Sequence, residues 1–226
     1  MPMKASGRAT EWQEIDRHDH GVGWIAHPEE KMQRASHAVE SDGKVWVIDP
    51  VDVEGLDDLL AEFGEVAGVV ILLDRHKRDA GKVANRHDVS VYVPSFFDGV
   101  AEDLDAPVKR FTNALGDTGY RLHSVVDNTF WKEGALYNEE TGDLFVPEAV
   151  GTTDYFHTED RELGVHPMLR LFPPDTLKAF EPTRIHVGHG PGVDDRATAK
   201  LREALSGSRA RTPRLYLKTA RDMIFG

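Results

Sequence analysis

The stretch of residues 44–94 decides the fold, and three apolar segments mark it: KVWVIDP (44–50), VAGVVILL (66–73) and VSVYVP (89–94). Their β-branched and aromatic residues predict strands, and the middle segment is apolar enough to be buried on both faces. Apolar residues at helical spacing predict short helices over 57–63 and 79–86. Strand, helix, strand, helix and strand in this order indicate a βαβαβ unit with right-handed crossovers.

The second half of the chain has a different pattern, with four short segments that predict strands: 120–126, 134–138, 144–146 and 184–187. A turn-rich sequence, NEETGD (138–143), joins the second and third of them, as in a hairpin. The last one runs into GHGPG (188–192), after which a helix is predicted over 197–205. No Pro/Gly/Ser-rich linker separates the halves, so we predict a single domain over residues 1–226.

Composition excludes several classes of function. The 226 residues include 27 Lys and Arg against 39 Asp and Glu, a net charge of −12, which argues against nucleic acid as a partner. The absence of cysteine excludes disulfides, cysteine-based zinc sites and thiol catalysis. No apolar run approaches the roughly 20 residues of a membrane span, and no apolar signal segment is visible. We therefore expect a cytoplasmic protein without a membrane partner.

Three polar loops follow predicted strands and gather side chains that ligate metals: LDRHKRDA (73–80), LFVPEA (144–149) and HVGHGPG (186–192). Loops at strand ends are where a sheet positions functional groups. Carboxylates and imidazoles are ligands for zinc and similar divalent ions, and these loops offer Asp74, His76, Asp79, Glu148 and His189. Asp49, at the end of the first strand, is expected to brace the loops beneath such a site.

Taken in order, these segments resemble the metallo-β-lactamase fold superfamily over residues 44–191. IDP after a strand, the apolar strand into a His-containing loop, HDVSVYVP, GALYNEETGDLFVPEA and VGHGPG occur in that family's order. The resemblance implies an α+β protein: a four-layer αββα sandwich of two mixed β-sheets flanked by helices.

The departures from the family pattern are as informative as the match. Active members carry His-x-His-x-Asp-His in the first loop, where this chain has Asp74, His76, Arg78 and Asp79. The bridging Asp of the family corresponds to Glu148, and only His76 and His189 match by both type and position. His123 does not fall in register with the family's middle histidine. The resemblance therefore implies a degenerate site.

A guanidinium cannot ligate a metal, so Arg78 disfavours a two-metal centre. The retained residues suffice for at most one zinc or other divalent ion, with ligands from His76, Asp79, Glu148 and His189. If the protein is an enzyme, which the sequence leaves open, we expect metal-dependent hydrolysis of an unknown small-molecule substrate. A metal-activated water would be the nucleophile, with Asp79 or Asp74 as general base.

The alternative is a non-catalytic binding or structural protein without metal, in which Arg78 pairs with Glu148 or Asp79 and these ion pairs replace the site. A full two-zinc hydrolase would need further ligands from His123, His157 or His166, and we consider it the weakest interpretation. The RHDH segment (17–20) precedes every predicted strand and is interpreted as a solvated loop. The sequence is compatible with either a monomer or a homo-oligomer.

Overall fold

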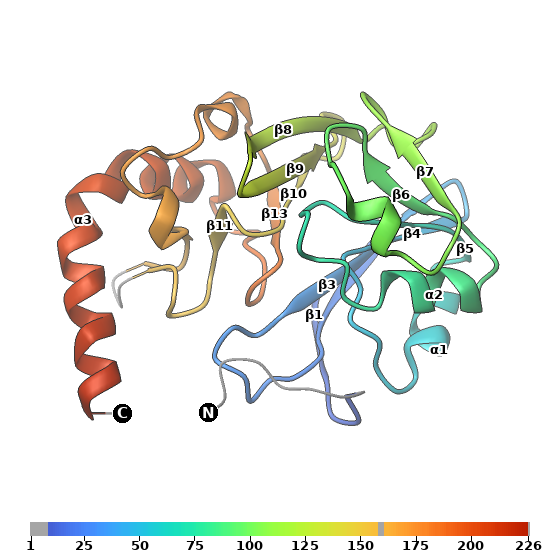
Figure 1. Ribbon diagram of the computed structural model, residues 1–226, viewed down its shortest axis with the longest axis horizontal. Coiled ribbons are helices and arrows are strands. Elements are labelled where there is room, and N and C mark those ends of the chain that lie inside the picture. The colour runs from blue at the N-terminus through green and yellow to red at the C-terminus, as the bar shows by residue number, and fades with distance from the viewer. Residues whose placement is uncertain (1–8, 158–160, 226) are drawn as a thin grey trace.

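The computed structural model describes residues 9–157 and 161–225 (Figure 1). Seven strands form the large sheet: β1 (Gln13–His18), β2 (Gly21–Ile25), β3 (Ala35–Ser41), β4 (Lys44–Ile48), β5 (Glu65–Val70), β6 (Val91–Pro94) and β7 (Val108–Phe111). Four form the small sheet: β8 (Arg121–Asn128), β9 (Trp131–Tyr137), β10 (Asp143–Val146) and β13 (Arg184–Val187). A further pair is β11 (Val150–Gly151) and β12 (Gly164–Val165).

Within the described ranges, three α-helices and three 3₁₀ helices connect or cover these strands: α1 (Leu56–Ala61), α2 (Ala80–Arg86), α3 (Ala197–Phe225), η1 (Val100–Asp103), η2 (Pro167–Leu169) and η3 (Asp175–Ala179). Both sheets are mixed. The large sheet is antiparallel from β1 to β4 and parallel from β4 to β7, while β10 pairs antiparallel with β9 and parallel with β13. The predicted βαβαβ unit is confirmed as β4–α1–β5–α2–β6.

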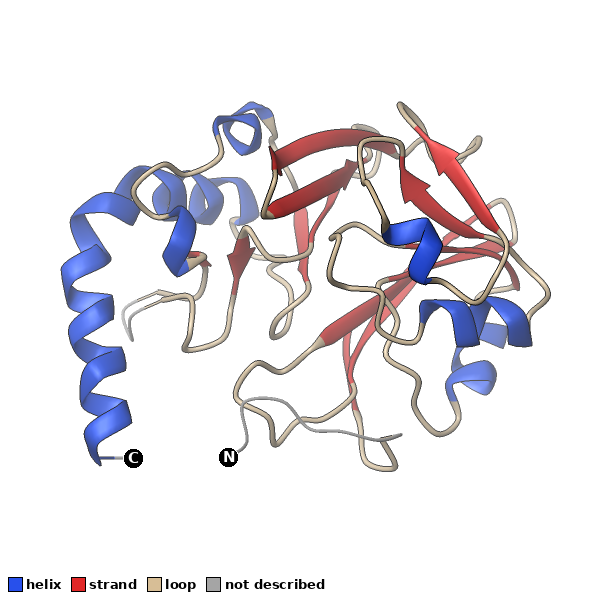
Figure 2. Cartoon of the chain, viewed as in Figure 1, coloured by secondary structure: helices blue, strands red, loops and turns tan. Residues whose placement is uncertain are grey.

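Alternation along β4 shows why the large sheet is covered on both faces. Val45 and Val47 pack into a cluster with Leu60 of α1, whereas Trp46 and Ile48 pack into the cluster between the two sheets. Successive side chains of a strand point to opposite faces, so one apolar strand can serve two cores. Figure 2 shows the helices of this half on the outer side of the large sheet.

The small sheet is built in the same way. Leu144 and Val146 of β10 share a cluster with Leu201 of α3, and Phe145 between them belongs to the cluster that faces the large sheet. The layers are therefore helices, large sheet, small sheet and helix, with α3 at the far end in Figure 1. The predicted four-layer αββα sandwich is confirmed.

Residues 9–43 are where prediction and structure differ most. The sequence pattern predicts no strand there, yet β1, β2 and β3 all belong to the antiparallel part of the large sheet. The interpretation of residues 17–20 as a loop is wrong for Arg17 and His18, which end β1. These strands carry polar residues and glycines, so successive antiparallel pairing from β4 through β3 and β2 to β1 organises them more than their own pattern does. Helix α3 also runs well beyond its predicted end at residue 205.

Among the described residues, no helix combines the length and the apolar composition needed to cross a bilayer.

Candidate metal site

Three loops that are far apart in sequence bring His76, Glu148 and His189 together. His76 lies between β5 and α2, Glu148 follows β10, and His189 follows β13. Because β10 and β13 are parallel, their ends deliver the last two residues to the same edge of the small sheet. One ligand atom from each of the three lies within 4.8 Å of the others, and both imidazoles are buried. All three residues are among those expected from the sequence.

The backbone at Gly188 explains how the loops come so close. A Cβ at this position would lie 2.2 Å from the carbonyl oxygen of Pro147 and 3.2 Å from the ring of His76. A real side chain cannot occupy that space, so glycine is required for the loop after β13 to pack against the loop after β10. The tight approach sets the position of His189, the next residue.

Hydrogen bonds fix the orientation of both imidazoles. Nδ1 of His189 lies 2.9 Å from the carbonyl oxygen of Met32, and because a carbonyl only accepts, Nδ1 carries the proton. Nε2 of His189 therefore has a free lone pair, and this atom is buried without a hydrogen-bond partner among the described residues. Nδ1 of His76 faces Oδ2 of Asp49 at 3.3 Å, which leaves Nε2 of His76 toward the site.

Asp49 has the bracing role expected from the sequence. Its Oδ1 accepts a hydrogen bond from the backbone N–H of Leu72 at 3.0 Å, and its Oδ2 faces His76. Burial raises the pKa of Asp49 to about 7, against the opposing effect of the Arg78 charge. Asp49 thus ties the end of β5 to the first ligand of the site.

A buried glutamate that sequence reasoning missed holds the loop of Glu148. The backbone N–H groups of Glu148 and Ala149 donate to Oε1 of Glu133 at 2.8 and 2.7 Å. The indole N–H of Trp131 donates to Oε2 at 2.8 Å. The signal available in the sequence was a charged residue within the apolar strand pattern of β9, where burial requires such partners.

Glu148 itself forms an ion pair with Arg75 rather than with Arg78. Nε of Arg75 donates to Oε2 at 3.2 Å, and Nε2 of His166 lies 3.6 Å from Oε1. Burial raises the pKa of Glu148, while Arg75 lowers it. Burial also lowers the pKa of His166 to about 4. At neutral pH, the site therefore pairs a carboxyl group with a neutral imidazole ring.

Arg78 lies beside His76 and is held there by backbone contacts. Its Nη1 donates to the carbonyl oxygens of Ala35 and Asp49 at 2.5 and 2.8 Å, and its Nη2 donates to that of Gly188 at 3.2 Å. Nη2 also lies 3.3 Å from Nε2 of His76. The predicted pairing of Arg78 with Glu148 or Asp79 is wrong, because converging carbonyl groups from three segments take its donors instead.

The charge of Arg78 acts on the neighbouring imidazole. Burial lowers the pKa of Arg78 to about 10, which leaves the guanidinium protonated at neutral pH. The pKa of His189 is held well below its usual value by burial, with His76 and Arg78 adding to the effect. The ring of His189 is therefore neutral and able to ligate a metal.

The structure does not bring all five expected residues together, because two carboxylates turn away. Oδ2 of Asp74 accepts from the backbone N–H of Lys132 at 3.0 Å, and Oδ2 of Asp79 accepts from that of Asp52 at 2.9 Å. Neither belongs to the group of ligand atoms formed by His76, Glu148 and His189. Both aspartates brace the loops by these hydrogen bonds.

The structure also shows the surroundings of the three histidines considered as ligands of a second zinc ion. His166 approaches Glu148 as described above. His157 lies with Nε2 2.8 Å from the carbonyl oxygen of Thr152, and the ring of His123 packs against Phe180. Neither of these two belongs to a group of potential ligands within the described residues.

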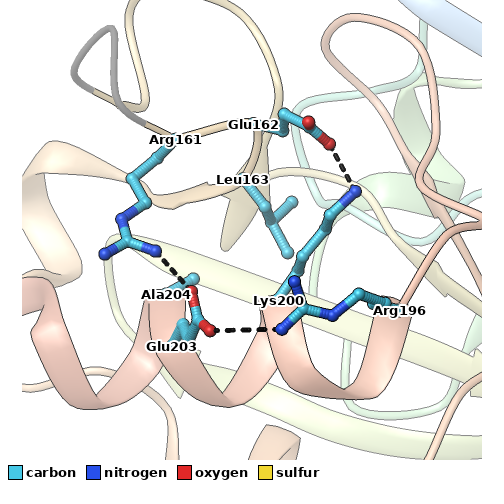
Figure 3. Close-up of a pocket in the computed structure, with 7 residues that line it drawn as sticks. All are labelled: Arg161, Glu162, Leu163, Arg196, Lys200, Glu203 and Ala204. Atoms are coloured by element: carbon cyan, nitrogen blue, oxygen red, sulfur yellow. Dashed lines mark hydrogen bonds and ion pairs between the residues drawn. The ribbon is translucent and has the colours of Figure 1, made fainter.

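A hollow of about 350 Å³ lies between α3 and the residues before β12 (Figure 3). Glu203 forms ion pairs with Arg161 and Arg196, and Lys200 pairs with Glu162. Figure 3 shows these side chains paired across the hollow. Because each charged side chain there already has an ion-pair partner and no histidine lines the hollow, we assign no site there.

Comparison with known proteins decides the fold. No protein-family model and no curated protein matches this chain. The DIM-1 metallo-β-lactamase exposed to ceftazidime superposes with a TM-score of 0.64 at 15% identity, covering 90% of this chain and 99% of that one. A metallo-β-lactamase from Pontibacter korlensis gives a TM-score of 0.65 at 14% identity, covering 88% and 99%. The chain has the metallo-β-lactamase fold.

A metallo-β-lactamase fold supports many chemistries, so function must be argued from the residues of the site. The side chains of His76, Glu148 and His189 are of the right types to hold one metal ion. Two imidazoles whose Nε2 atoms face the site, together with one carboxylate, form the His₂Glu set found in catalytic zinc sites. The buried, partnerless Nε2 of His189 is the atom that a metal ion would satisfy. This group of side chains could therefore hold one metal ion.

Proposed function

We propose that this protein binds one divalent metal ion through His76, Glu148 and His189 and uses it in hydrolysis of a small molecule. The observation that carries the proposal is the buried lone pair on Nε2 of His189, a residue of the group that includes His76 and Glu148. A buried acceptor without a partner costs free energy, and a metal ion removes that cost.

The surroundings of the ligands support the same interpretation. Histidines that ligate metals donate their other ring N–H to a carboxylate or a carbonyl, which fixes the ring and raises its basicity. His76 has Asp49 in that role and His189 has Met32. A bound divalent ion would polarise a substrate oxygen and lower the pKa of a water molecule.

The remaining residues hold the ligands in place. Arg75 and the Glu133 anchor restrict Glu148 to one orientation. His166 accepts from the backbone N–H of Met168 through Nδ1 at 3.2 Å, so its neutral ring carries a proton on Nε2, facing Glu148. We place His166 as the nearest proton carrier and give Asp74 and Asp79 no role as bases, because backbone hydrogen bonds hold their carboxylates elsewhere.

Arg78 limits the site to one ion. Its guanidinium occupies space beside His76 and adds a fixed positive charge, which opposes a second dication. The resemblance to the family places a metal-ligating Asp at this position, so the proposed centre is a rebuilt one. The substrate is a small molecule whose chemistry the site does not specify.

One observation favours a second candidate, a non-catalytic protein in which Arg78 replaces the metal. Nη2 of Arg78 approaches the same nitrogen of His76 that a metal would use. The contact is long, at 3.3 Å, and the lone pair of His189 stays without a partner among the described residues. Because Arg78 leaves His189 unsatisfied, we rank the metal-binding function first.

Calorimetric titration with zinc of chelator-stripped protein tests the proposal. His189→Asn and, separately, Glu148→Gln should each weaken one binding event at least about 10-fold, because each removes a ligand. His123→Asn, a histidine outside the site, is the matched control and should bind as the wild type does. Chromogenic ester, lactam and phosphodiester substrates then report hydrolysis that requires zinc. Identical isotherms for the wild type and both ligand variants would favour the non-catalytic candidate.

A further inference from the structure

A second group of ligand-type side chains lies where β1, β3 and β13 approach one another. It consists of Asp16, His37 and His186, and a ligand atom from each lies within 4.8 Å of the other two. Both histidines are 4% exposed, and the side chain of Asp16 is 13% exposed. None of the three belongs to the site of His76, Glu148 and His189.

The hydrogen bonds of the two histidines leave the same atom free on each ring. Nε2 of His37 lies 2.9 Å from the carbonyl oxygen of Val187, and Nε2 of His186 lies 3.0 Å from Oδ1 of Asp143. Both acceptors require the proton on Nε2, so in the neutral rings both Nδ1 atoms carry lone pairs. Both Nδ1 atoms are buried and have no hydrogen-bond partner in the described part of the chain.

This pattern is the one that orients histidine ligands: the distal nitrogen donates to a carbonyl or carboxylate while the other faces the metal. Asp143 also accepts from Arg184, at 2.6 Å to Oδ1 and 3.0 Å to Oδ2. A carboxylate so fully engaged orients His186 rather than ligating an ion. The neighbouring group of His18, Asp143 and His186 is therefore the weaker of the two.

Asp16 is held toward the histidines without satisfying them. The backbone N–H of Gly192 donates to both of its carboxylate oxygens, at 2.8 and 2.9 Å. Oδ2 lies 4.0 Å from Nδ1 of His37, too far for a hydrogen bond. The ligand atoms of the three residues are too far apart to satisfy one another by hydrogen bonds, but they are close enough to surround one ion.

Glycine keeps the space beside His37 open. Gly23 pairs with His37 across β2 and β3, and a Cβ at Gly23 would lie 2.7 Å from Nδ1. A route for an ion also exists, because Asp16, His18 and His186 line a hollow of about 440 Å³ at the surface.

We propose that Asp16, His37 and His186 form a second metal site, which binds a divalent ion such as zinc and ties the large sheet to β13 of the small sheet. Imidazole nitrogen and carboxylate oxygen suit zinc, and three protein ligands leave a fourth position for water. The ion joins β1 and β3 to β13, so its first role is to stabilise the packing of the two sheets. The proposal does not depend on the function proposed for the other site.

The test uses a protein in which the other site is disabled. Chelator-stripped His189→Asn is compared with His189→Asn/Asp16→Asn, and His189→Asn/Asp98→Asn is the control with an exposed aspartate changed. We expect His189→Asn and the control to bind one zinc per chain and to show a rise in Tm on zinc addition. Asp16→Asn should weaken zinc at least about 10-fold and abolish the rise in Tm. No zinc bound to folded His189→Asn would overturn the proposal.

An NMR measurement on the wild-type protein can distinguish the two proposed metal sites. In a long-range ¹H–¹⁵N spectrum, zinc should shift the Nδ1 resonances of His37 and His186, whereas coordination at the other site uses Nε2 of His76 and His189. Shifts confined to the Nε2 pair would overturn the second site and support the first. Shifts confined to the Nδ1 pair would support the second site and contradict the proposed function.

Discussion

Nη2 of Arg78 lies 3.3 Å from Nε2 of His76, so a guanidinium stands beside the nitrogen that faces the proposed metal. The same guanidinium binds the carbonyl oxygens of Ala35, Asp49 and Gly188. Arg78 therefore links three segments of the backbone around the site while opposing the charge of an ion. Its two effects, on metal affinity and on stability, can be measured separately.

Replacement of Arg78 by aspartate should raise the affinity for zinc. The change removes a positive charge beside His76 and adds a carboxylate where the family pattern has a ligand. We expect a gain of at least about 10-fold, equal to about 1.4 kcal/mol, by calorimetric titration. Lys77→Asp, at a more exposed cation of the same loop, is the comparison. Equal affinities for the wild type and Arg78→Asp would mean that position 78 does not face the metal, and the rebuilt-site hypothesis would be dropped.

Arg78→Ala should lower the free energy of unfolding by about 3 kcal/mol, because several backbone carbonyl groups lose their donor at about 1 kcal/mol or more each. The cause differs from the one that the sequence suggests, which is the loss of a partner for a buried carboxylate. Urea denaturation measures the change. A lysine at this position keeps the charge but cannot bind all the carbonyl groups. The free energy of unfolding of Arg78→Lys should therefore fall between those of the wild type and Arg78→Ala. A fully stable alanine variant would contradict this account of the backbone contacts.

Glu133→Gln should destabilise the protein by roughly 1–3 kcal/mol, since both carboxylate oxygens accept from donors and an amide NH₂ would face one of them. The loop of Glu148 should loosen at the same time and weaken zinc binding. Glu139→Gln, at an exposed position, is the matched control for urea denaturation. Unchanged stability in Glu133→Gln would show that this anchor is dispensable.

Asp52 should govern part of the stability at acid pH. It is 1% exposed and forms ion pairs with Lys82 at 2.6 Å and Arg86 at 3.0 Å. Burial alone would raise the pKa of Asp52, but the pairs with Arg86 and Lys82 outweigh it and lower the pKa. A lowered pKa in the folded state means that the stabilisation is present above the unfolded value of about 3.9 and is lost as the pH falls below it.

Asp52→Asn should therefore cost roughly 1 kcal/mol at pH 7, a modest value because both cations are partly exposed to solvent. The difference from the wild type should shrink below about pH 4. Chemical denaturation at several pH values measures it, with Asp98→Asn as the control. A difference that stays constant down to pH 3 would contradict the ion-pair explanation.

The sequence predicts the parts of the fold that local pattern determines. The strands β4, β5 and β6 have continuous apolar runs, and the order of motifs along the chain points to His76, Glu148 and His189. Local pattern fails for β1 to β3, where polar residues and glycines become strands through antiparallel pairing with the neighbouring strands of the chain. The contacts of Arg78 could not be predicted, because they go to backbone carbonyl groups that every residue carries. The group of Asp16, His37 and His186 could not be predicted either, because it joins β1 and β3 of the large sheet to β13 of the small sheet.

The most direct test of the central claim is an anomalous diffraction map, recorded at the zinc edge from crystals grown with zinc. The account predicts one peak between His76, Glu148 and His189, with ligand distances of about 2.0–2.2 Å. Arg78 should remain beside it and no second ion should share the three residues. A map with no peak there, or with two adjacent ions in that site, would contradict the account.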